Sequence, residues 1–199
     1  MADDGKMNLD VFKIVCKALS RSDSLETMAE HLTQLLVGAL EIKGSTLFVL
    51  NRDTKELEIL ASFGLSPTYL NKGPVMADRG ICALLEGKPI IVRDVANDER
   101  LQYPAEAQEE GIGAIVSICI PFYGEVIGGL RLYHHRTWDI SAQDLDYLFI
   151  MAEHVGLAMM FTRAVSALQA IEETMAGLPA ELMPILGRGQ DVRNPTGPA

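Results

Sequence analysis

Residues 114–133 read AIVSICIPFYGEVIGGLRLY, and this stretch decides the fold class. It contains two β-rich runs, 114–120 and 126–133, which are joined at Tyr123-Gly124. A two-residue connection that ends in glycine is typical of a tight antiparallel hairpin, because glycine adopts positive φ without strain. The stretch therefore predicts a hairpin in the middle of the chain.

The turn also predicts which residues of the hairpin share a face. With Tyr123-Gly124 as the loop, Val116 lies opposite Arg131, and Val116 and Ile118 share a face with Arg131. The intervening residues of the run 114–120 then face the other side. Because an unpaired charge is costly beneath apolar helices, we assign the face of Arg131 to a pocket.

The segments around this hairpin add strands in the middle of the chain and helices at its ends. Apolar residues recur at steps of three and four before residue 40 and again after the capping-box sequence at Ser141. We predict α+β architecture with no alternating strand–helix pattern. The predicted helices are 8–20, 22–40, 79–85, one after Pro104, and 141–175; the further predicted strands are 45–50, 56–63 and 89–92.

Length and composition indicate one domain with extensions at both ends. The chain has 199 residues, 48% of them hydrophobic, and a formal net charge of −10. We predict an N-terminal dimerisation helix in residues 1–21, a folded domain in 22–176, and a tail in 177–199. Four prolines and four glycines in the tail predict that it is flexible. The C-terminal helix has apolar residues on two sides, which predicts a parallel homodimer through Met151, Phe161, Val165 and Leu168.

Charge and motifs exclude several classes of function. The acidic balance disfavours nucleic-acid binding, because phosphate contacts require basic patches. The longest apolar run, 114–121, predicts no membrane span, and the polar start MADDGKMNLD predicts no secretory leader. The three cysteines, Cys16, Cys82 and Cys119, lack metal-site spacing and are expected to be reduced in a cytoplasmic protein. We expect no metal site.

Four stretches resemble the GAF domain family in matching order. They are GSTLFVLNRDTKELEILASFGL (44–65), DRGICALLEGKPIIVRDV (78–95), RLQYPAEAQEEGIGAIVSICIPFYGEVIGGLRLY (100–133) and DISAQDLDYLFIMAEHVGLAM (139–159). The resemblance implies a central antiparallel sheet of profilin-like form. The terminal helices would cover one face, and short helices and loops would enclose a small-molecule pocket on the other. It also implies dimerisation through the terminal helices.

The special chemistries of the family are poorly matched. Its cyclic-nucleotide motif survives only at Asp144, no Cys-His dipeptide is present for bilin attachment, and no histidine is expected in the pocket as a haem ligand. The cysteine spacing does not match that of the members that reduce free methionine sulfoxide. We therefore expect no enzyme activity, and the cofactor is unknown.

The sequence predicts a stand-alone, bacterial-type sensor or regulatory module in signal transduction, with an unidentified small-molecule ligand and a possible signalling partner. Asp94 is a candidate ion-pair partner for Arg131, and such a pair could hold an anionic or polar ligand or be purely structural. The alternatives are a reductase of a small oxidised substrate and a scaffold that only dimerises. The predicted ligand-binding residues are Ile81, Cys82, Asp94, Tyr103, Val116, Ile118 and Arg131.

Overall fold

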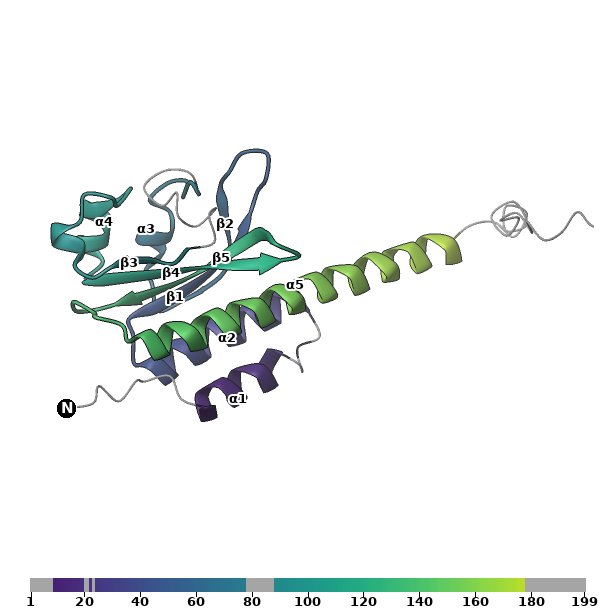
Figure 1. Cartoon of the computed structure of the whole chain (residues 1–199). Coiled ribbons are helices and arrows are strands. Elements are labelled where there is room, and N and C mark those ends of the chain that lie inside the picture. The colour runs from purple at the N-terminus through teal and green to yellow at the C-terminus, as the bar shows by residue number, and fades with distance from the viewer. Residues whose placement is uncertain (1–8, 20–21, 23, 78–87, 178–199) are drawn as a thin grey trace, which may run out of the picture. The chain divides into compact units, whose positions relative to one another are not determined.

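The computed structural model describes residues 9–19, 22, 24–77 and 88–177 (Figure 1). Contacts divide the chain into two compact units, Met1–Thr162 and Arg163–Ala199. All of the predicted tail except Gly177 lies outside the described residues, and so does the whole of the predicted helix 79–85.

A five-stranded antiparallel sheet forms the centre of the first unit. Its order is β2-β1-β5-β4-β3. The central hairpin is the predicted one, and Tyr123 and Gly124 have φ of 51° and 76°, as a primed two-residue turn requires. The antiparallel sheet confirms the predicted α+β class. The strands are β1 Gly44–Leu50, β2 Leu57–Phe63, β3 Ile90–Val92, β4 Ala114–Phe122 and β5 Glu125–His134.

The helices cover the two faces of the sheet unequally. Figure 1 shows the long helices on one face and the short ones on the other, as expected. The helices of the first face are α1 Leu9–Leu19, α2 Leu25–Leu40 and α5 Ala142–Ala176, of which residues 142–162 belong to this unit. The short elements are α3 Pro67–Leu70, η2 Val95–Asn97 and α4 Pro104–Glu109. Helix α2 has Ser24 as its N-cap, whereas the sequence pattern predicts Ser22 or Asp23.

Two hydrophobic cores lie on opposite sides of the sheet. Between the sheet and the long helices, Leu32, Leu130 and Leu148 are buried with their neighbours. On the other side, Phe48 and Tyr133 lie in a second cluster with residues from the short elements. Complete removal of such apolar side chains from water is the main stabilising term of both layers.

Helix α5 approaches the sheet at its only described glycine. A Cβ atom placed on Gly156 would lie 2.2 Å from the carbonyl oxygen of Pro121 and 3.2 Å from Ile120 Cγ2. Glycine therefore permits the backbone of α5 to contact the backbone of β4. Met151, which the sequence pattern assigned to a dimer interface, is instead fully buried in the core of its own chain.

Helix α5 is also long and apolar enough to cross a membrane by length and composition, contrary to the expectation from apolar runs. A third of the relevant window, 33%, is buried inside the protein. Leu148, Met151 and Val155 pack in the core beneath the sheet, and core helices commonly pass the same test.

A β-bulge corrects the predicted register of the central hairpin. Pairing shifts between Ile120 and Pro121, so Ser117, not Val116, lies opposite Arg131. A one-residue slip exchanges the two faces of a strand. Val116 and Ile118 are therefore fully buried in the core beneath the long helices, and their predicted place beside Arg131 is wrong.

Candidate functional site

Arg131 is the central polar residue of the face opposite the long helices. Its side chain is 6% exposed and lies on β5, on the same face as Tyr133. Its Nε donates a hydrogen bond to Ser117 Oγ over 2.9 Å, and its guanidinium carbon lies 5.4 Å from the centre of the Phe48 ring. Arg131 thus lies on the predicted face of the sheet, opposite the long helices, but Val116 and Ile118 do not share that face with it.

Two buried tyrosines accompany the arginine. The rings of Tyr69 and Tyr133 meet edge to face, with centres 5.8 Å apart. Burial raises the pKa of both phenols, and the positive charge of Arg131 opposes part of each rise. Hydrogen bonds with Thr46 and Arg131 also lower the pKa of Tyr133. Both hydroxyls therefore stay protonated at neutral pH and can donate hydrogen bonds.

Lys72 supplies a second positive charge. Its Nζ lies 3.9 Å from the centre of the Tyr69 ring and donates to the Tyr69 carbonyl oxygen over 3.0 Å. Burial, followed by the charge of Arg131, lowers the pKa of Lys72 to about 8. The negative charges of Glu106 and Glu110 oppose this shift. Tyr69 and Lys72 were not predicted as site residues, because nothing in their local sequence pattern places α3 over β5.

Glu110 connects α3 to α4 and to the start of β1. It accepts hydrogen bonds from the Ser66 backbone N–H over 3.1 Å and from the Ser66 hydroxyl, and it pairs with Lys43 at 3.3 Å. Burial alone would raise the pKa of Glu110, but the bonds from Ser66 and Lys43 lower it on balance. This carboxylate is thus already occupied by partners of its own.

The remaining predicted site residues are not gathered around Arg131. Tyr103 donates from its hydroxyl to the Pro74 carbonyl oxygen over 2.9 Å, and its ring centre is 5.8 Å from Lys72 Nζ. Asp94 caps η2, accepting from Ala96 N and Asn97 Nδ2. The predicted pair of Asp94 with Arg131 is therefore not formed. Ile81 and Cys82 lie outside the described residues, with the rest of the predicted helix 79–85.

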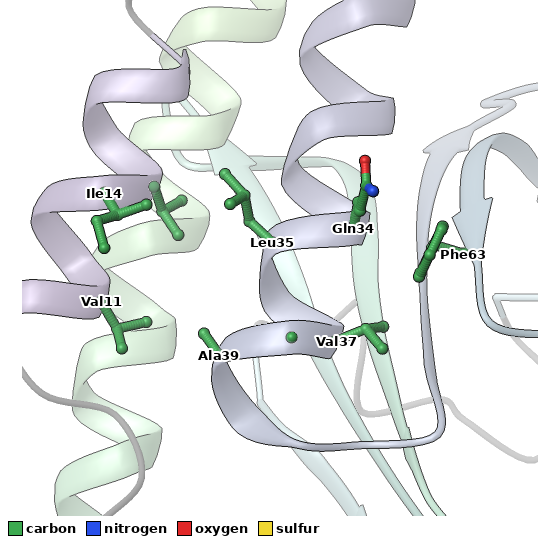
Figure 2. Close-up of a pocket in the computed structure, with 9 residues that line it drawn as sticks. Val11, Ile14, Gln34, Leu35, Val37, Ala39 and Phe63 are labelled. Carbon is green, nitrogen blue, oxygen red and sulfur yellow. The ribbon is translucent and has the colours of Figure 1, made fainter.

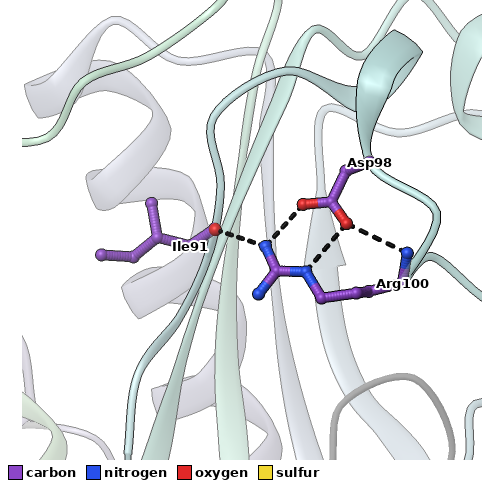
Figure 3. Close-up of polar contacts among 3 residues, drawn as sticks. All are labelled: Ile91, Asp98 and Arg100. Atoms are coloured by element: carbon purple, nitrogen blue, oxygen red, sulfur yellow. Dashed lines mark hydrogen bonds and ion pairs between the residues drawn. The ribbon is translucent and has the colours of Figure 1, made fainter.

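Asp94 instead lines a shallow surface pocket of about 280 Å³ at the edge of the sheet. Figure 3 shows the polar contacts of Arg100, which lines the same pocket. Its Nε and Nη2 donate to the carboxylate of Asp98 over 2.8 and 2.5 Å, and Nη2 also donates to the Ile91 carbonyl oxygen over 3.0 Å. Ile91 belongs to the edge strand β3, so the guanidinium covers a backbone acceptor that would otherwise be open to another strand.

Arg100→Ala is expected to reduce stability by about 1 kcal/mol at pH 7, because a largely exposed ion pair contributes little. The hydrogen bonds from Arg100 lower the pKa of Asp98 in the folded state. Their stabilisation is therefore present above the ordinary aspartate pKa and is lost as the pH falls through the lowered value. Urea unfolding of both proteins between pH 2 and 7 should show the difference shrinking in acid. An equal difference at every pH would contradict this role.

A larger groove, of about 440 Å³, lies on the other side of the molecule between α1, α2 and the end of β2. Figure 2 shows Ile14 of α1 and Phe63 of β2 on its two sides. Both are large exposed side chains. Apart from Gln34 its lining is apolar, and it contains none of the predicted site residues.

The exposed face of α5 carries an apolar stripe. The side chains are 42% to 68% exposed, and their positions fit alternating steps of four and three residues when His154 and Ala164 are included. This is the spacing of the a and d positions of a coiled coil. In the first unit they are Ile150, Leu157 and Phe161; in the second unit they are Leu168, Ile171 and Met175.

The described cysteines and histidines form no reactive cluster. Cys16 and Cys119 are free thiols, and burial raises the pKa of each. His31 lies exposed on α2, and His134 and His135 stack at the end of β5. In the described part of the chain, no three His, Cys, Asp or Glu side chains are placed to hold a metal ion.

A model of the GAF domain family matches residues 19–160. The chain belongs to the GAF domain family. Members of this family are sensory and regulatory modules of signalling proteins, and they bind small-molecule ligands. The five-stranded sheet and its helical layers are the GAF fold, as the resemblance implied.

Solved GAF structures share the fold at low sequence identity. The GAF domain of a phosphoenolpyruvate-protein phosphotransferase from Coxiella burnetii superposes with a TM-score of 0.72 at 19% identity, covering 80% of this chain and 96% of that one. The corresponding Acinetobacter domain has a TM-score of 0.69 at 17% identity, with coverages of 83% and 98%. Free methionine-R-sulfoxide reductase from Neisseria meningitidis, solved with its substrate, has a TM-score of 0.66 at 14% identity, with coverages of 78% and 89%. No curated protein sequence matches the chain.

Proposed function

We propose that this GAF domain is a non-enzymatic sensor that binds a small ligand on the face of Arg131 and passes its state to a signalling partner through dimeric terminal helices. The observation that carries the proposal is a buried arginine without a carboxylate partner among the described residues. A buried charge without a counter-charge is costly, and a bound ligand would compensate it. The Neisseria structure demonstrates a substrate complex in the same fold.

The two described thiols, Cys16 and Cys119, support a sensor over a reductase. A thiol reacts as the thiolate, so reactive cysteines have lowered pKa values. Burial acts in the opposite direction on Cys16 and Cys119. We place the protein in the bacterial cytoplasm, in line with the free thiols of its described cysteines and the bacterial origin of the similar structures.

The proposed dimer is a parallel pair of α5 helices in register. Six of the large exposed hydrophobic side chains of the described residues lie on the α5 stripe, and a second copy would remove them from water. In a parallel coiled coil the flanking positions would bring together Met160 with Val165 and Ala167 with Glu172, so no like charges oppose each other. The interface therefore differs from the sequence prediction in excluding Met151.

Native mass spectrometry of the full chain, purified without added ligand, tests the sensing function. We expect the wild-type protein to retain a small molecule that Arg131→Gln loses, since a charged hydrogen bond contributes about 1.5–3 kcal/mol, or roughly 10- to 100-fold in affinity. Lys55→Gln, an exposed change in the β1–β2 turn, is the control. Equal retention by all three proteins would show that Arg131 does not hold the ligand, and its absence from all three would favour the dimerising scaffold.

A further inference from the structure

The guanidinium of Arg131 has hydrogen-bond donors left over. It carries five N–H groups. One is used by Ser117 Oγ, and the Tyr133 hydroxyl forms a second contact. In the described part of the chain, every buried side-chain nitrogen and oxygen has a hydrogen-bond partner. A terminal nitrogen of Arg131 that bonds to neither residue therefore reaches accessible space, although the side chain as a whole is nearly buried.

Among the described residues, the charges around Arg131 leave one positive charge unbalanced. The described side chains that act on this cluster are three cations, Arg131, Lys72 and Lys43, and two carboxylates, Glu106 and Glu110. Lys43 pairs with Glu110, and Glu106 acts on Lys72. The excess positive charge therefore falls on Arg131.

The surroundings of Arg131 on the same face are largely apolar. The Phe48 ring lies beside the guanidinium, and Ile115 and Cys119 of β4 belong to the same buried cluster as Tyr133. A small-ligand site commonly combines an apolar lining with a few polar groups that fix orientation. Here the fixing groups are the guanidinium and two hydroxyls, those of Ser117 and Tyr133.

We infer that the ligand is a small monocarboxylate with an apolar body, whose carboxylate binds Arg131 and whose body lies against the apolar residues of this face. This inference rests on the proposed sensing function and names its ligand class. A carboxylate supplies one negative charge and two acceptor oxygens that match the fork of an arginine. A phosphate group carries about −1.5 to −2 at pH 7 and would leave an excess negative charge in a buried site.

Lys72 provides a readout that does not depend on activity. Burial and the charge of Arg131 hold the pKa of Lys72 at about 8. A carboxylate on Arg131 would cancel part of the second effect, so binding should raise the pKa of Lys72 by roughly half a unit or more. Nuclear magnetic resonance of the lysine side chains measures this in the wild-type protein, without a substitution that endangers folding.

The experiment titrates the full chain with five probes: benzoate, hexanoate, acetate, benzamide and inorganic phosphate. Calorimetry gives affinities, and the Lys72 signal gives its pKa, with Lys55 as the internal control. We expect benzoate or hexanoate to bind at least about tenfold more tightly than acetate, benzamide and phosphate, and to raise the pKa of Lys72 alone. Arg131→Gln should weaken that binding about 10- to 100-fold, and Arg131→Lys should weaken it less.

Three results would overturn the inference: equal binding of benzamide, tighter binding of phosphate than of any monocarboxylate, or no response of Lys72 to any probe. The retained molecule found by native mass spectrometry separates this failure from failure of the sensor. If wild-type protein retains a neutral or phosphorylated molecule that Arg131→Gln loses, the sensing function stands and the monocarboxylate class is wrong.

Discussion

Phe161→Glu is expected to raise the dissociation constant of the proposed dimer at least about 100-fold. Phe161 is 68% exposed and occupies an a position of the α5 stripe, so in the dimer its ring would lie opposite its own copy. An unpaired charge buried in an apolar interface costs about 3 kcal/mol or more, which corresponds to this change in affinity. Sedimentation velocity over a concentration series measures it.

Ser166→Glu is the matched control, because it adds the same charge to the same helix at an exposed position on the opposite side of the heptad. It should leave the dimer intact, and neither variant should change the folding of the first unit. An Ile171→Cys variant tests the direction of the helices, since it forms a disulfide with its own copy only if the helices are parallel and in register. A wild-type chain that sediments as a 21.7 kDa monomer at every concentration would disprove the dimer.

Gly156→Ala is expected to destabilise the domain by about 2–3 kcal/mol. Its Cβ would lie 2.2 Å from the Pro121 carbonyl oxygen, and no rotamer change relieves a clash with backbone. Overpacking of this kind costs about 1–3 kcal/mol. In addition, α5 must shift away from β4, which loosens its other core contacts. The higher helix propensity of alanine offsets about 1 kcal/mol of this cost at most. Thermal unfolding should show a melting temperature roughly 5–10 °C lower.

Gly38 of α2 provides the matched comparison, because it is also a helical glycine and a Cβ there meets nothing within 4 Å. Gly38→Ala should stabilise the domain by about 0.5–1 kcal/mol through helix propensity alone. If Gly156→Ala behaves like Gly38→Ala, the close approach of α5 to β4 is not a constraint on the fold.

The architecture could be predicted from the sequence because the sequence patterns that indicate it are local. The turn at Tyr123-Gly124, alternation along the strands and the three-four spacing of the terminal helices each depend on neighbouring residues. These signals predicted antiparallel strands, the helical layer and the GAF fold, and the order of four motifs along the chain identified the family.

The candidate site could be predicted from the sequence only in part. The cost of burying a charge under apolar helices assigned Arg131 to the correct face. The residues predicted to lie beside it were wrong because the bulge opposite Ile120 and Pro121 adds Ile127 to β5, so one more residue separates the turn from Arg131. A proline follows Ile120, but the pattern of a strand does not by itself reveal where pairing slips, since that depends on how both strands fit the layers above and below.

Sequence alone determined the class of fold, the family and the charged residue on which a ligand site can be built, because periodicity and turn chemistry are properties of short segments. Tertiary structure decided which side chains meet. It placed Tyr69 and Lys72 over β5, assigned Asp94 to the sheet edge, and divided the apolar residues of α5 between the core, as with Met151, and the exposed stripe that includes Phe161. These contacts join residues that are distant in sequence, and their geometry depends on the packing of whole layers, which no local pattern records.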